Sequence, residues 1–191
     1  MKPINNWENV KPMGNSFEAL PAGAYVCEIK QVVEKPNRNN GGSHLEVNFE
    51  VAEGEYKDFF SKDYRSQDRE DKFWRGIINQ NVPNESADNY ENQKRFFRSF
   101  TNAVEASNPG YHWDWNETGL KGKKIGVVFG EREKQSQKGT VYTITNAKKI
   151  ISVEDVCSGN FKIPEKKCLV PTGNTFGGFT AITPDSDDLP F

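Results

Sequence analysis

Three observations predict a mainly β domain with a helical insert and a flexible, acidic C-terminal tail. Apolar and polar residues alternate along residues 24–33 and 45–51, as expected for strands with one buried face. Between about residues 62 and 120 the apolar residues recur at helical spacing instead. From residue 171 onward, glycine, proline and threonine interrupt every periodic run, and no Lys or Arg occurs.

The first three strands follow one another at hairpin spacing. A polar leader over residues 1–20 precedes the first strand at 24–33, and a polar loop over 36–43 leads to the second strand at 45–51. A Glu-Gly turn then leads to a third strand, which we predict over residues 55–61.

Helices and two more strands are predicted after the third strand. Helical spacing of apolar residues predicts helices over 68–80 and 89–107. The alternating pattern then returns and predicts strands over 123–130 and 139–150, joined by a polar loop over 131–138.

This order of elements is that of an OB-fold, a five-stranded barrel with helix between strands 3 and 4. Alternation alone does not separate the barrel from a small sandwich, and the helical segment is what favours the OB-fold. We therefore expect a leader over 1–20, an OB-fold domain over 21–156 with a helical insert at about 62–120, and a linker with an acidic tail over 157–191.

Charge is distributed unevenly along the 191 residues, although the net charge is only -2. Residues 121–170 hold 11 basic and 5 acidic side chains, a net charge of +6. Residues 171–191 hold three acidic side chains and no basic one, a net charge of -3. The basic block can attract phosphate, and the acidic end can occupy the same block when phosphate is absent.

Other sequence features favour a cytoplasmic protein without cofactor or metal. No apolar stretch approaches the roughly 18 residues of a membrane span, and no signal peptide is expected. The three cysteines, Cys27, Cys157 and Cys168, are widely spaced, which suits a reducing compartment. No metal-binding or catalytic motif is found, so we expect no enzyme activity.

The chain ends in a short acidic and apolar motif that suits docking to another protein. Its residues are Asp185, Asp187, Asp188, Leu189, Pro190 and Phe191. Carboxylates favour a basic surface, and the terminal ring and carboxylate can share one pocket. This end resembles the acidic tip of bacterial and phage single-stranded DNA-binding proteins; the alternative is an acidic end whose Pro-Phe is accidental.

The body of the chain resembles a family of phage single-stranded DNA-binding proteins of the OB-fold type. The resemblance covers most of residues 18–156 and rests on the segments 20–25, 53–57 and 120–124. It implies a protein of the host bacterial cytoplasm that coats single-stranded DNA during replication, recombination and repair, with RNA as the alternative ligand. It also implies that the tip recruits partner proteins, and it leaves monomer and homodimer open.

Binding an unpaired strand needs cations for phosphates and flat rings for bases. An OB-fold offers its outer strand face and the loops joining strands 1–2 and 4–5. The expected DNA-binding residues are Lys35, Arg38, Tyr56, Phe59, Tyr64, Lys121, Lys123, Lys124, Arg132, Lys134, Lys138 and Tyr142. For the cations the alternative is a solvated loop, and for the rings it is a place in the core. Trp113 and Trp115 are expected to plug one barrel end.

Two other functions remain open at this stage. Acidic residues between Asp58 and Asp71 could hold magnesium in a metal-dependent nuclease. The arginines and lysines among them favour a salt-bridged solvent face instead. A phage accessory or interaction protein that does not bind DNA is the other alternative.

Overall fold

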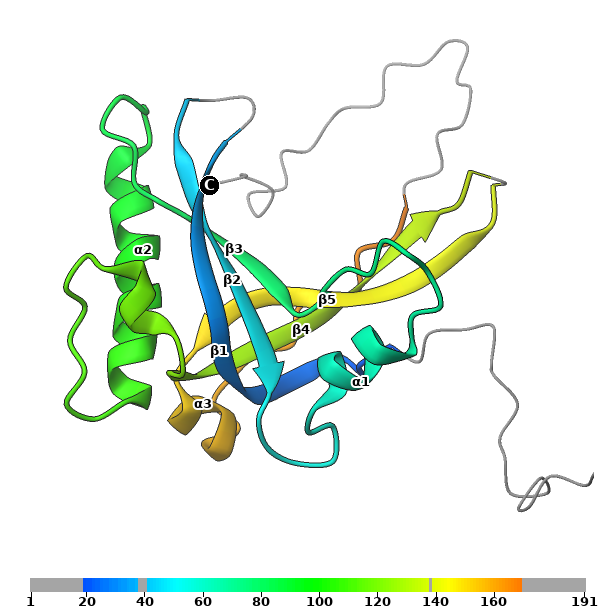
Figure 1. The fold of residues 1–191 in the computed structure, drawn as a ribbon. Coiled ribbons are helices and arrows are strands. Elements are labelled where there is room, and N and C mark those ends of the chain that lie inside the picture. The colour runs from blue at the N-terminus through cyan, green and yellow to red at the C-terminus, as the bar shows by residue number, and fades with distance from the viewer. Residues whose placement is uncertain (1–18, 38–40, 138, 170–191) are drawn as a thin grey trace, which may run out of the picture.

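The computed structural model describes residues 19–37, 41–137 and 139–169 (Figure 1). Five strands form one sheet: β1 Gly23–Pro36, β2 Ser43–Val51, β3 Ile77–Asn81, β4 Lys124–Gln135 and β5 Val141–Ile151. The helices are α1 Phe59–Ser66, α2 Tyr90–Ser107, α3 Val153–Ser158 and the 3-10 helix η2 Glu117–Leu120. The acidic tip and most of the leader lie outside the described residues.

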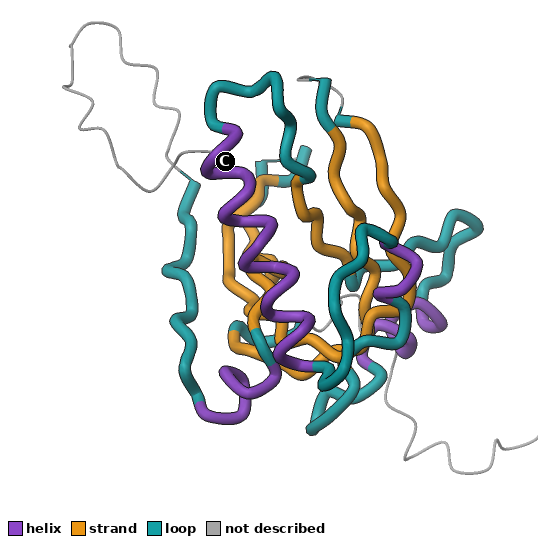
Figure 2. The backbone as a smooth tube through the Cα atoms, turned by 90° about the vertical axis from the view of Figure 1, so that its left-hand side faces the viewer, coloured by secondary structure: helices purple, strands orange, loops and turns teal. Residues whose placement is uncertain are grey.

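The sheet is antiparallel throughout, in the order β3-β2-β1-β4-β5. This confirms the mainly β prediction. Within the described segments, however, no strand pairing joins β3 to β5, so the sheet is not closed into a barrel. Helix α2 packs against β3, β4 and β5 and lies along one side of the strands (Figure 2).

The long strand β1 holds the two halves of the sheet together. Residues 27–36 of β1 pair with β2, and residues 23–28 pair with β4. A register shift between Ile29 and Gln31 marks a β-bulge, and bulges bend and twist a strand. The curved sheet wraps its inner face around one apolar core.

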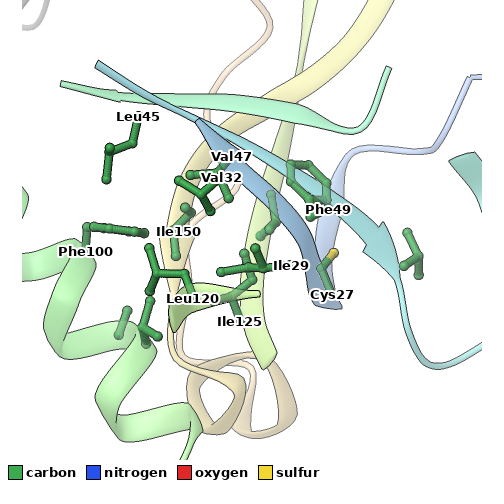
Figure 3. Packing of buried hydrophobic residues seen from close by; sticks show 14 of the residues in the cluster. Cys27, Ile29, Val32, Leu45, Val47, Phe49, Phe100, Leu120, Ile125 and Ile150 are labelled. Atoms are coloured by element: carbon green, nitrogen blue, oxygen red, sulfur yellow. The ribbon is translucent and has the colours of Figure 1, made fainter. Parts of the chain in front are cut away.

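The core is formed by the inner faces of the strands and by α2 (Figure 3). The alternating residues of β2 point inward as predicted, because Leu45, Val47, Phe49 and Val51 are all buried. From α2, the buried side chains include Phe97, Phe100 and Val104. The helix predicted over 89–107 is thus confirmed.

The prediction of a third strand over residues 55–61 is wrong, because part of this segment forms α1. The carboxylate of Glu50, which is buried in β2, accepts hydrogen bonds from the backbone N–H groups of Phe60 at 2.9 Å and Ser61 at 2.7 Å. These N–H groups belong to the first turn of a helix and have no acceptor within it. A distant acidic side chain therefore stabilises a helical start that the local pattern does not reveal.

The helix predicted over 68–80 is also wrong, because the real third strand, β3, lies there. Phe49 N donates to Gly76 O at 2.8 Å, and Ile77 and Ile78 then pair with Asn48 and Val47. Gly76 permits this approach, since a Cβ atom there would lie 2.3 Å from Phe49 O. Helix α1 consequently precedes β3, and only α2 and η2 lie between strands 3 and 4.

The last predicted loop is also shorter than expected. Residues 131–135 extend β4, and β5 begins at Val141, so most of the predicted loop is a two-stranded ribbon. The short helix α3, which the alternating pattern did not indicate, begins after Ser152, whose hydroxyl accepts from Asp155 N at 3.1 Å.

Candidate nucleic-acid interface

The β4–β5 hairpin continues beyond the rest of the sheet as a ribbon. β1 pairs with β4 only as far as Phe129, which faces Gly23. Residues 130–135 and 141–146 then pair only with each other in the sheet, and Figure 1 shows this ribbon extending away from α2. We call these two stretches the ribbon.

One face of the ribbon combines an aromatic ring with cations. Lys134 is paired directly with Tyr142, and Arg132 with Ile144. Because side chains alternate along a strand, these four lie on the same face. Tyr142 is 46% exposed, so its ring is open to a ligand. This face offers both a stacking surface and positive charge.

Further cations lie at the base of this face. The pKa of Lys148 is lowered by burial and then by the nearby charges of Arg132 and Lys167. The absence of a side chain at Gly130 leaves room for Lys148 and Pro164, since a Cβ atom at Gly130 would lie 3.3 Å from Lys148 Cγ and 3.4 Å from Pro164 Cβ. The side chains of Lys148, Arg132 and Lys167 are therefore close enough to one another to concentrate positive charge at the base of the ribbon.

The segment that follows α3 neutralises an acidic side chain of the ribbon. Glu133 N donates to Lys167 O at 2.8 Å, and Lys167 N donates to Glu131 O at 3.2 Å. The Glu133 carboxylate lies 3.0 Å from Lys166 Nζ and accepts from Leu169 N at 3.1 Å. The Lys166 hydrogen bond is the main reason that the pKa of Glu133 is lowered. The charge of Glu133 therefore opposes that of Arg132 and Lys134 less than the sequence suggests.

The other predicted cations lie elsewhere. Lys124, at the start of β4, pairs with Glu53 at 2.6 Å, and Lys123 Nζ lies 4.5 Å from the centroid of the Tyr111 ring. Together with Lys121 they occupy the end of β4 opposite the ribbon. Lys35, at the far end of β1, pairs with Glu46 at 2.7 Å. Arg38 and Lys138 lie outside the described residues.

The predicted stacking rings are placed in two different environments. Tyr56 and Phe59 are half-buried and pack edge to face against each other, with centroids 6.3 Å apart, at the rim of the core. Tyr64, on α1, is 39% exposed, and the centroid of its ring lies 6.1 Å from that of Trp74. Tyr64 and Tyr142 are thus the predicted rings that solvent reaches most readily.

The two loop tryptophans behave differently from each other. Trp113 is partly buried and packs against the core, although the sheet is not closed into a barrel that it could plug. Trp115 is 77% exposed, and one face of its indole stacks on Phe97 with centroids 6.1 Å apart and planes at 9°. It covers Phe97 from outside and does not fill the interior.

Sequence reasoning missed Lys148 and Lys167 as members of the cationic face. A signal was present for Lys148, since two adjacent lysines at 148 and 149 interrupt an otherwise apolar strand end. Lys167 carried no such signal, because its position depends on how the chain returns along β4 after α3.

In the described part of the chain, no group of three or more His, Cys, Asp or Glu side chains is arranged to hold a metal ion. No helix within the described residues is long and apolar enough to span a bilayer. No model of a known protein family matches the chain, and no curated protein matches it significantly.

Proposed function

We propose that this protein binds single-stranded DNA and coats it during replication and recombination in the bacterial cytoplasm, without catalysing a reaction. The observation that carries the proposal is the ribbon face, where Tyr142 is exposed beside Lys134 and Arg132, with Lys148 at its base. Rings stack on bases of any sequence, and cations follow the phosphates, so this combination suits unpaired polynucleotide.

The order of the strands supports the proposal. The sequence β3-β2-β1-β4-β5, with α2 inserted between β3 and β4, is the order of an OB-fold opened between strands 3 and 5. OB-folds are commonly only partly closed, and they use the loop between strands 4 and 5 to bind oligonucleotides. In this chain that position is the ribbon.

The acidic tip at 185–191, which is argued from its sequence alone, adds a second part to the proposed mechanism. Its carboxylates would compete with DNA for the cationic face at low salt, and Phe191 would engage replication or recombination proteins once DNA displaces the tip. Deleting residues 185–191 should therefore strengthen DNA binding at low salt, and unchanged or weaker binding would contradict the competition.

The main test is a titration of labelled oligo(dT) with the full chain, followed by fluorescence anisotropy. Tyr142→Ala should weaken binding by about 1–3 kcal/mol, the usual value of a base–ring stack. Lys134→Gln should reduce the salt dependence by about 0.7 in the slope of log K against log salt. Lys94→Gln, an exposed lysine on α2, is the charge control and should change neither.

The same assay separates the alternatives. Duplex DNA and RNA of equal length show whether the site selects unpaired strands and whether it distinguishes DNA from RNA. Cleavage of the oligonucleotide with magnesium would favour a nuclease. Failure of the wild-type chain to bind any unpaired oligonucleotide in dilute buffer would refute the proposal and favour an accessory role.

A further inference from the structure

Helix α1 and the loop that joins it to β3 present two aromatic rings to solvent. Tyr64, near the end of α1, is 39% exposed, and Phe73, within the loop, is 45% exposed. Exposed rings are unremarkable when they are single and mobile. Here, however, the surrounding structure fixes the backbone that carries Phe73.

Two buried polar side chains hold the loop in one shape. Asp63 and Gln67 are 8% and 9% exposed, although polar groups are usually excluded from the interior unless they are bonded. Gln67 Oε1 accepts from Phe73 N at 3.1 Å, and Gln67 Nε2 donates to Phe73 O at 2.9 Å. Asp63 Oδ1 lies 2.9 Å from Arg75 Nη1. The peptide groups of Phe73 are therefore clamped on both sides while its ring faces outward.

Two guanidinium groups lie over the Phe73 ring, so a base that stacks on this ring takes the place of one of them. The guanidinium carbon of Arg69 lies 5.1 Å from the ring centroid, and that of Arg75 lies 5.0 Å from it. The charge of Arg75 is balanced by Asp63, so Arg69 is the better candidate for a phosphate contact. Guanidinium planes and aromatic rings both stack on nucleobases.

A chain of packed rings connects this loop to the base of the ribbon. Tyr64 lies 6.1 Å from Trp74, Trp74 lies 6.1 Å from Phe60, and Phe60 lies 6.3 Å from Phe129, centroid to centroid. Phe129 is the last β4 residue paired with β1 before the ribbon begins. Phe129 points into the core, so these rings meet β4 on the face opposite to that of Arg132 and Lys134. One polynucleotide strand would therefore reach both places only by passing around the ribbon.

We propose that Tyr64, Arg69 and Phe73 form a second nucleobase-stacking site for the same single strand, which we call the arginine–aromatic platform. The proposal rests on the proposed function, because it assumes that the strand is already held at the ribbon. The platform supplies a ring for a base and a guanidinium for the adjoining phosphate, and the clamp on Phe73 reduces the entropy lost on binding.

The test uses the full chain and labelled oligo(dT) of about 15 nucleotides, within the range that a single OB-fold covers. Phe73→Leu keeps an apolar side chain but removes the planar ring, and it should raise Kd by about 5- to 150-fold, as expected for a lost base stack. Phe73→Tyr should restore binding. Phe96→Leu, at an exposed phenylalanine of α2, is the matched control and should bind like the wild type.

Arg69→Gln provides an independent variant in case Phe73→Leu alters the loop. It should reduce the salt slope by about 0.7, as one lost phosphate contact requires. Thermal melting of each variant shows whether the fold is intact.

The outcomes separate this inference from the function on which it rests. If Tyr142→Ala weakens binding while Phe73→Leu and Arg69→Gln bind like the wild type, the platform is refuted and the ribbon stands. If Phe73→Tyr binds as poorly as Phe73→Leu, stacking at this ring is refuted. If the wild-type chain binds no oligonucleotide, both proposals fall, and a protein partner becomes the better occupant of the platform.

Discussion

Glu50 is the side chain whose replacement should reveal most about how this fold is held together. It lies in β2, is only 2% exposed, and its carboxylate accepts three backbone hydrogen bonds. Oε1 accepts from Val51 N and Phe60 N, each at 2.9 Å, and Oε2 accepts from Ser61 N at 2.7 Å. Two of these donors form the first turn of α1, which has no side-chain cap of its own at Asp58.

The expected effect of Glu50→Gln follows from this geometry. The glutamine oxygen can keep the two bonds at Oε1, but as neutral bonds about half as strong. The amide nitrogen then faces Ser61 N, so a partly buried donor loses its acceptor at a cost of about 1–3 kcal/mol. Together these losses predict a decrease of about 2–4 kcal/mol in the free energy of unfolding.

Urea unfolding followed by tryptophan fluorescence measures this change. For a chain of this size the same loss should lower Tm by about 4–16 °C. Glu46→Gln is the matched control, because Glu46 lies on the same face of β2 but forms only a surface ion pair with Lys35. The control should lose about 1 kcal/mol or less. A loss below about 0.5 kcal/mol for Glu50→Gln would refute the idea that this carboxylate holds α1.

Three further predictions concern the segment after α3, a glycine and a tyrosine. Because the pKa of Glu133 is lowered by Lys166, its contribution to stability is present above pH 4.5 and is lost as pH falls through the lowered pKa. Glu133→Gln should release residues 166–169 from β4 already at neutral pH, seen as faster amide exchange at Lys167; unchanged exchange would contradict this. Gly76→Ala should destabilise the fold by about 1–3 kcal/mol or prevent folding, since its Cβ atom would overlap Phe49 O; a urea midpoint equal to that of the wild type would show that the strands separate freely there. Burial, followed by the nearby Tyr56 and Glu55, raises the pKa of Tyr25 to about 12, so stability should fall as pH rises from 10 towards 12. In an ultraviolet titration, Tyr25→Phe should lack the phenol that ionises at the highest pH in the wild type. Loss of a phenol that ionises at lower pH would contradict the raised pKa of Tyr25.

The sequence predicted the parts of the fold whose pattern is local. Alternation in residues 45–51 identified the buried face of β2, and helical spacing identified α2, because each pattern reflects one element facing one core. Residues 55–81 were misread. Aromatic residues there satisfy both strand and helical spacing. Contacts with β2 decide which part of the segment becomes helix and which becomes strand.

The candidate site was predicted in part. Arg132, Lys134 and Tyr142 were expected and lie on one face, because the alternation of a hairpin can be read from its sequence. Phe73 and Arg69 were not expected, because a clamp such as Gln67 becomes visible only when the loop is seen folded.

The amino-acid sequence by itself determined the β-rich class, the buried face of β2 and the separation of a basic block from an acidic end, since these depend on composition and on the period of apolar residues. Tertiary structure alone decided where α1 and β3 form, that β3 and β5 do not pair within the described residues, and which cations gather at the ribbon. The physical reason is that a buried carboxylate such as Glu50, or a backbone contact such as that at Gly76, acts between segments far apart along the chain. Such contacts outweigh local preferences that differ by only a few tenths of a kcal/mol per residue.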